Sequence, residues 1–252
     1  MIGALQPLAA LVVALGLWQA LALWAGSPLL IPSPRSVGLV FGALLANGEL
    51  PEHVAASLQR LAVGLLVGVP LGTVLGCGMG RFRVLDAFFD PFLRMANSTP
   101  AIALIPFSLL WFGVTEVARY ALLVYIVALT VTLSARHGVR QVPAIRLKAA
   151  SSLGVSGAEA FFRVIIPSTF PAILAGTRTA IGLGVMVIVA AEMLGATSGL
   201  GYLIMQGRAH YNVERMFVGV IGLGTLSLVL DRGFSLAIER GMPRWSAKHR
   251  VR

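Results

Sequence analysis

This chain of 252 residues contains six long runs of apolar residues that are nearly free of charged side chains. A helix of about 20 mainly apolar residues matches the thickness of a bilayer. Lipid offers the backbone no hydrogen-bond partners, so only helices or closed barrels can span it, and these runs lack the alternation of barrel strands. We predict an all-α membrane protein with six transmembrane helices: Pro7–Trp24, Leu61–Gly80, Pro100–Phe112 extended at its N-terminal side, Ala118–Ala135, Ala172–Leu194 and Met216–Ile238.

Charged residues make up only 12% of the chain, whereas soluble domains contain about 25%. No stretch between the runs is long enough to form a soluble domain, so residues 1–252 are predicted to form one transmembrane domain. The first run could also be a secretory signal peptide. However, such a peptide needs basic residues before its apolar part, and the first basic residue is Arg35. We therefore expect the first run to be a span.

Basic residues are distributed unevenly between the two sides of the predicted bundle. With the N-terminus in the cytoplasm, the inner loops and the C-terminal end hold most of the Lys and Arg residues, as is typical of the cytoplasmic side. Aromatic residues favour membrane interfaces; Trp24, Trp111, Phe112 and Tyr120 fall at the outer one and Trp245 at the inner one. The sequence predicts a multi-pass membrane protein with both termini cytoplasmic.

The third run is the shortest and contains Pro100 and Pro106, which remove helix hydrogen bonds. A kinked or partly unwound helix is expected there. Asn97, Ser98 and Thr99 precede Pro100 at the predicted start of this span. Their polar groups beside a helix N-terminus suit an anion in a translocation path, and the alternative is an ordinary helix cap.

Ionisable groups at membrane depth are costly and usually functional. Glu192 lies near the outer end of the fifth run. One interpretation is a gate or path residue, and the other is a carboxylate held by the backbone of the following Gly-rich segment. Arg178 lies near the inner boundary, from where its side chain can extend to water. Asp231 is expected to pair with the adjacent Arg232. Glycines in the second and sixth runs predict close helix packing: Gly64, Gly68, Gly72, Gly76, Gly80, Gly219, Gly222 and Gly224.

The longest polar interval is the predicted inner loop, residues 136–171. Its sequence is typical of two short helices joined at Gly154, since glycine ends a helix in the left-handed conformation without steric cost. Ser156 followed by Glu159 has the pattern of a capping box that starts the second helix. Pro167 is expected to end that helix.

The side chains of the two short helices differ in size. The first is expected to expose Ala149 and Ala150, whose small side chains let another surface approach the backbone closely. The second carries a larger apolar set suited to packing under the bundle: Phe161, Phe162, Ile165 and Ile166. The loop is therefore predicted to dock against a partner.

The spacing within this loop resembles the Glu-Ala-Ala signature of ABC importer permeases. The matching residues are Lys148, Ala149, Ala150, Gly154, Val164, Ile166 and Pro167. The resemblance implies a type I importer permease, in which this loop couples the membrane subunit to an ATPase. Val164 and Ile166 are conservative departures from the signature, but Lys148 reverses the charge of its Glu.

The resemblance extends over nearly the whole chain and is most specific to permeases for nitrate, sulfonate, taurine and bicarbonate. It is carried by Ile31–Pro34, Ser57–Arg60, Asn97–Pro106, Trp111–Gly113 and Ala190–Tyr202. It implies a homodimer of this subunit in the bacterial inner membrane, two copies of an ATPase subunit and an external substrate-binding protein. A small anionic solute is the implied cargo. The alternative on the same scaffold is another small organic solute, such as an aromatic acid or a vitamin precursor.

The chain carries no motif for chemistry of its own. It lacks a phosphate-binding loop, a catalytic triad pattern and a cluster of metal ligands, and Cys77 is its single cysteine. We expect no enzyme activity and no cofactor or metal, with ATP bound by the partner subunit. Although the net charge is +10, nucleic acid is not an expected partner. An ion-gradient transporter or a membrane enzyme are the competing classes, but neither explains the inner loop.

Overall fold

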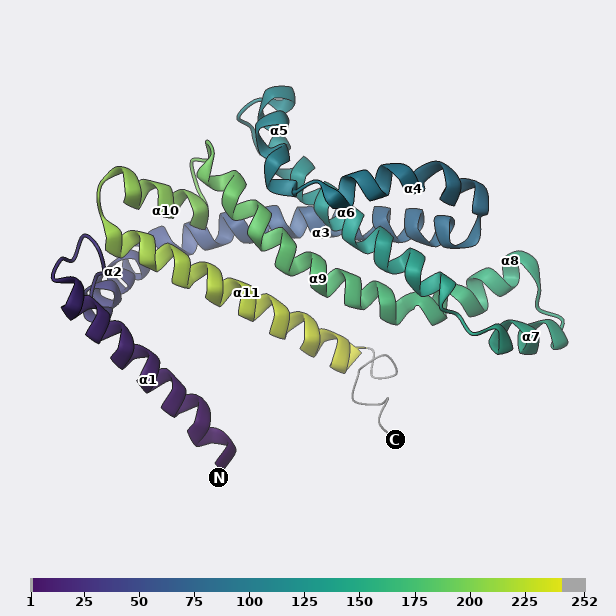
Figure 1. Ribbon diagram of the computed structural model, residues 1–252, viewed down its shortest axis with the longest axis horizontal. Helices are drawn as coiled ribbons and strands as arrows, with labels where there is room; N and C mark the ends of the chain where they lie inside the picture. Colours follow the sequence, from purple (N-terminus) through teal and green to yellow (C-terminus); the bar gives the residue numbers. More distant parts are fainter. Residues whose placement is uncertain (1, 242–252) are drawn as a thin grey trace. The chain divides into compact units, whose positions relative to one another are not determined.

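The computed structural model describes residues 2–241, with side chains from residue 9 onward, so Trp245 lies outside the described residues. Helices and short connections make up this part of the chain, and it contains no strand, as predicted (Figure 1). The elements are α1 (Ile2–Ala25), α2 (Pro34–Ala46), α3 (Glu49–Arg81), α4 (Arg83–Ser98), η1 (Ala101–Leu104), α5 (Ile105–Phe112), α6 (Glu116–Arg140), α7 (Ala144–Ser152), α8 (Gly157–Ala160), η2 (Phe161–Ile165), α9 (Ile166–Met193), α10 (Leu200–Ala209) and α11 (Val213–Gly241).

Four helices are long and apolar enough to cross a membrane: α3, α6, the continuous helix Gly157–Met193 and α11. A fifth span is available if α4 and the pair η1 and α5 count together, although the chain bends by 96° between them. The predicted run Pro7–Trp24 lies within α1, whose described apolar part, Ala9–Ala25, is shorter than a full span. Each predicted run is thus helical. By length and composition the described helices give four or five spans, compared with the six predicted.

The chain divides into two compact units. One contains the described residues of Met1–Ser57 and Glu192–Thr225, and the other those of Leu58–Ala191 and Leu226–Arg252. In the second unit, buried side chains of α3, α6, η2 and α9 form one apolar cluster: Cys77, Val127, Val131, Ala135, Val139, Ile165, Ile173 and Ala180. A second cluster joins α4 to α3 and α6 through Met79, Leu93 and Leu129.

Glycines bring α3 and α6 into close contact at five positions, as their spacing in the sequence predicts. A Cβ atom placed on Gly64 would lie 2.6 Å from Cβ of Leu123, and one on Gly76 would lie 2.4 Å from the carbonyl oxygen of Thr132. Gly68, Gly72 and Gly80 meet α6 in the same way. We call this contact, from Gly64 to Gly80, the glycine seam.

The first unit combines α1, α2 and α10 with the first turns of α3 and α11. Trp18 of α1 stacks on Phe217 of α11 with ring centroids 5.5 Å apart, and its indole N–H donates to the carbonyl oxygen of Pro32 at 3.0 Å. Gly219 and Gly222 of α11 pack against α10 as expected, whereas Gly224 has no neighbour within 4 Å of an added Cβ. The expected packing face on the sixth run is therefore confirmed only for its first part.

Candidate functional site

The inner-loop helices meet at a turn built as the sequence predicts. α7 ends at Ser152, and Gly154 adopts a φ of +80°. The N–H of Val155 donates to the carbonyl oxygen of Ala150 at 2.9 Å, and the N–H of Gly154 donates to that of Ser151 at 3.0 Å. This pair of bonds is the Schellman arrangement, which satisfies the last carbonyls of α7 and reverses the chain.

The second inner-loop helix differs from the prediction at both ends. Ser156 occupies the N-cap position, but its side chain makes no capping hydrogen bond. Glu159 instead pairs with Arg163 at 2.9 Å, one turn along the same helix. Pro167 does not end the helix, which continues from Gly157 to Met193. The missing N–H of Pro167 is accommodated after a π-helical stretch, η2, where the usual bonding pattern is already relaxed.

The segment from α7 to α8 exposes some of the residues with a predicted coupling role and buries others. Lys148 and Ala149 are exposed, while Ala150 is 7% exposed, contrary to the expectation for that residue, because its face of α7 packs toward α8 and η2. Leu153 at the turn is 82% exposed. The structure therefore offers a short helix with large apolar side chains beside small ones, not a helix with two small exposed side chains.

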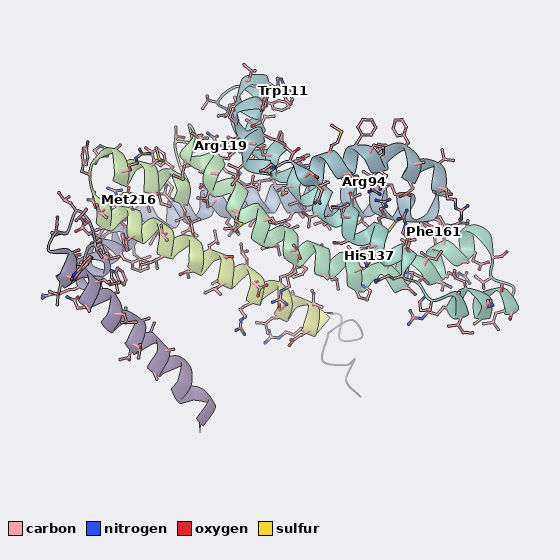
Figure 2. All side chains as sticks on the ribbon, viewed as in Figure 1. Arg94, Trp111, Arg119, His137, Phe161 and Met216 are labelled. Carbon is pink, nitrogen blue, oxygen red and sulfur yellow. The ribbon has the colours of Figure 1, made fainter. Side chains whose placement is uncertain are left out.

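The apolar set of the second inner-loop helix divides between interior and surface. Ile165 is buried, and Phe161, labelled in Figure 2, packs against the cluster of α3, α6 and α9. Phe162 is 65% exposed, so it does not pack under the helices of this chain as predicted. Val164, Ile166 and Pro167 are half-buried at the start of the long helix, which joins the exposed segment directly to a membrane span.

The polar triplet of the third span lies at a helix end opposite to the predicted one. Asn97 and Ser98 end α4, and the hydroxyl of Thr99 donates to the carbonyl oxygen of Met95 at 2.9 Å. The predicted helix N-terminus is therefore wrong here, and the expected support of an anion by a helix dipole is absent, because a helix C-terminus carries the negative end of the dipole. The predicted break does occur at Pro100, whereas Pro106 lies in the first turn of α5, where a missing N–H has no cost.

A cavity of about 270 Å³ opens at this break. Asn97 and Thr99 line it from one side, and Thr130 of α6 and Met186 of α9 line it from the others. The break in the third span therefore places polar groups beside a hollow among apolar helices. In a membrane, irregular backbone is tolerated where it lines such a cavity.

Glu192 is the centre of a buried polar cluster in the first unit, with only 1% of its surface exposed. The hydroxyl of Ser57 donates to both carboxylate oxygens, at 2.8 and 2.9 Å, and the backbone N–H of Gly201 donates to one of them at 2.9 Å. The same Ser57 oxygen accepts the N–H of Leu200 at 2.9 Å. The carboxylate is thus held by the following Gly-rich segment, as one of the two sequence interpretations describes.

Two further residues complete this cluster and escaped the sequence prediction. The N–H of Gly199 donates to Nδ1 of His53 at 3.3 Å, and Gly199 adopts a φ of +115°. A Cβ atom on Gly199 would lie 2.3 Å from the carboxyl carbon of Glu192. The run of small residues after Glu192 was the available signal, because close backbone approach to a carboxylate requires glycine.

Ion pairs hold several of the other charges in or near the predicted spans. Arg178 pairs with Asp231 through two hydrogen bonds of 2.6 and 2.7 Å, so the expected pairing of Asp231 with its sequence neighbour is wrong. The Glu116 carboxylate accepts from Arg60 at 2.7 Å and from Arg119 at 2.8 Å, and both arginine side chains are 4% exposed. Such pairing lowers the cost of charge at membrane depth.

Comparison with known proteins agrees with this architecture. The family described as binding-protein-dependent transport system inner membrane component matches residues 68–240. A taurine transport system permease of Escherichia coli is 30% identical over 233 residues, covering 90% of this chain and 84% of its own length. A Bacillus subtilis protein named for aliphatic sulfonates transport is 31% identical over 234 residues, covering 92% and 84%.

Solved structures share the fold at lower identity. A crystal structure of an amino acid ABC transporter aligns with a TM-score of 0.63 at 19% identity, covering 81% of this chain and 97% of that one. The inward-facing MetNI methionine ABC transporter aligns with a TM-score of 0.58 at 17% identity, covering 76% and 94%. These similarities define the class of the protein: an integral membrane permease of ABC type. The chain belongs to the binding-protein-dependent transport system inner membrane component family, and sulfonate and taurine permeases are among its relatives.

Proposed function

We propose that this chain forms the translocation path of an ATP-driven importer for a small anionic solute such as an aliphatic sulfonate, taurine or nitrate. An external binding protein would deliver the solute, and two copies of a separate ATPase subunit would bind a homodimer of this chain on the cytoplasmic side. The distribution of basic residues supports a cytoplasmic position for both termini and for the α7–α8 segment.

The α7–α8 segment carries the proposal. Lys148 and Ala149 are exposed on a short helix, and the helix after the turn continues without interruption into a membrane span. A displacement of α7 by a bound ATPase would therefore be passed to one continuous helix, Gly157–Met193. ATP binding by the partner would then shift the population between two states of the bundle.

Replacing Ala149 with Glu tests this contact. A long charged side chain would keep the partner surface from approaching α7, so we expect ATP-dependent uptake to fall by about a hundredfold or more, the effect of burying an unpaired charge in an interface. The measurement is uptake into vesicles, together with the amount of ATPase that copurifies in mild detergent. Ala46→Glu is the matched control, because Ala46 is an exposed alanine at the end of α2. Undiminished uptake in Ala149→Glu would remove α7 from the ATPase contact.

The break at Pro100 is the proposed path element, and charge tests the sign of the solute. Asn97→Asp adds a negative charge to the cavity lined by Asn97 and Thr99, so uptake of an anion should fall about tenfold through like-charge repulsion. Uptake of taurine and of an alkanesulfonate is measured in the reconstituted complex, with Asn47→Asp at the end of α2 as control. Faster uptake of a cationic or neutral solute by Asn97→Asp would contradict an anionic cargo while leaving the class intact.

A further inference from the structure

The outer face of α7 carries a charged side chain at its centre. Ala150 is 7% exposed and marks the inner side of the helix, which packs toward α8 and η2. Successive residues of a helix are rotated by about 100°, so Lys148 lies about 160° away from Ala150, on the opposite side. Ile145 and Ser152 share this outer side, because they are three residues before and four residues after Lys148. Lys148 is therefore directed to the surface.

The side chains beside Lys148 are short. Ala144, Ala149 and Ser152 are all exposed. The hydroxyl of Ser152 donates to the carbonyl oxygen of Lys148 at 3.1 Å, which keeps that side chain against the helix. A partner that packs on this face can approach the backbone closely, and it must then enclose the long stem of Lys148 in a depression of its own surface. The Lys148 ammonium would thus lie at the centre of the contact and not at its rim.

No carboxylate neutralises Lys148 within residues 2–241. The sequence of α7 contains no Asp or Glu, and no ion pair joins Lys148 to another described residue. Glu159, the nearest acidic residue along the chain, is paired with Arg163 at 2.9 Å. Arg146 adds a second positive charge to the same helix. An ammonium buried in an interface is costly unless it is paired, so a partner that covers α7 must supply the negative charge.

The inner leaflet of the membrane is another anionic surface, but α7 lacks the pattern of a helix that lies on lipid. Such a helix has its charged and apolar side chains on separate faces. In α7, Ile145 is 71% exposed and lies on the same side as Lys148. In α4 the two kinds are separated: Phe88 and Phe92 are exposed on one side and Asp90 lies on the other. The face of α7 therefore favours a protein partner.

We propose that Lys148 binds a carboxylate in the groove of the ATPase subunit that receives α7. This inference rests on the proposed function and assigns the chemistry of the partner surface at the same contact. The ammonium donates a charge-assisted hydrogen bond to an Asp or Glu side chain of the ATPase, while the short side chains around it let the groove close on the helix. The charge also gives specificity, because a groove with a basic residue at this place is rejected.

Chemical crosslinking tests for the carboxylate. A carbodiimide joins a lysine amine directly to a carboxylate in contact with it, with loss of water and without a spacer. The sequence has two lysines, Lys148 and Lys248, so Lys248→Arg leaves Lys148 as the single lysine while keeping the charge. In the complex of this variant with its ATPase, peptide mass spectrometry should find Lys148 joined to an Asp or Glu of the ATPase. Absence of this crosslink in complexes that stay assembled would overturn the proposal.

The affinity of the ATPase for the permease in nanodiscs measures the effect of the charge. Lys148→Gln should weaken binding about thirtyfold, because it leaves a buried carboxylate unpaired, and Lys148→Glu about a thousandfold, because it places a like charge beside it. Arg83→Glu, the same charge reversal at an exposed residue of α4, should weaken binding by less than about fivefold. Replacing the crosslinked acid of the ATPase with Lys should restore binding to Lys148→Glu.

The outcomes separate this inference from the proposed function. If Lys148→Glu binds the ATPase as tightly as the unchanged chain while Ala149→Glu does not, α7 remains the contact and the assigned carboxylate is wrong. If both variants bind normally, α7 is not the contact and both proposals fail. If Lys148→Glu loses affinity only in nanodiscs that contain phosphatidylglycerol, Lys148 contacts anionic lipid and the assignment to the ATPase is overturned.

Discussion

The glycine seam and the α7–α8 segment both depend on glycine, but for opposite reasons. Along the seam, Gly76 is required because α6 leaves no room for a side chain, with a carbonyl oxygen 2.4 Å from the position of an added Cβ. At the turn after α7, Gly154 has open space around it and is required only for its φ of +80°. One glycine serves packing between helices and the other serves the path of the backbone.

This difference follows the physical task of each region. The seam lies among helices whose buried side chains include Val127, Val131 and Ala135, all fully buried, so its geometry is fixed by contacts within the chain. The α7–α8 segment has Lys148, Ala149 and Leu153 exposed, so much of its surface is available to another molecule. The coupling role that we propose would need both: a packed part, and an exposed part whose shape is held by its own hydrogen bonds.

The largest effect is expected at the seam. Gly76→Val would drive a branched side chain into the backbone of α6, which cannot rotate away, so we expect a loss of about 3 kcal/mol in the free energy of unfolding. The midpoint of thermal unfolding in detergent measures it. Gly224→Val in α11 is the control, because nothing lies within 4 Å of its added Cβ. Equal midpoints for the two variants would show that α3 and α6 are not in close contact.

Local features of the fold were predictable from the sequence where they depend on residues close together in the chain. The spacing of Gly64 to Gly80 predicted a packing face, and Pro100 predicted the break in the third span. The turn at Gly154 was also predicted, because it is formed by six consecutive residues. What the spacing of glycines in α3 does not specify is the helix that packs on them, since that choice depends on the whole chain.

Other features depend on distant residues or on adjustments of the backbone. Ser57 and Glu192 are separated by 135 positions, and nothing near Ser57 indicates that its hydroxyl binds a carboxylate. Pro167 was expected to end a helix, but the π-helical stretch before it lets the helix continue. Asn97 is expected at a helix start because the segment before it carries Asp86, Asp90 and Arg94 and does not resemble an apolar run. In the structure this segment is the amphipathic helix α4, which ends beside Asn97.

The hydrogen-bonded Glu192 cluster extends the comparison to the first unit. Ser57→Ala would leave the N–H of Leu200 without its acceptor and take one donor from the buried Glu192 carboxylate. We expect a loss of about 2 kcal/mol in the free energy of unfolding, less than at the seam. Thr179→Ala, which removes an exposed hydroxyl bonded to the carbonyl oxygen of Ala175, is the control and should cost far less. No difference between the two variants would mean that the Glu192 cluster contributes nothing to stability.

The smallest effect on stability, combined with a complete loss of transport, is expected at Gly154. Gly154→Val forces a branched side chain into the left-handed region at a cost of about 1–2 kcal/mol, and no neighbouring atom adds to it. The turn can relieve this strain by opening, which breaks the bond from Val155 to Ala150 while the packed helices stay intact. The midpoint of unfolding should therefore change little, while α7 loses its fixed orientation and ATP-dependent uptake is abolished. Gly42→Val on the exposed face of α2, with ordinary helical backbone and open space, controls for the added volume. Retained uptake in Gly154→Val would mean that the shape of this turn is not what couples the membrane helices to the ATPase, and the functional contrast between the two glycines would fail.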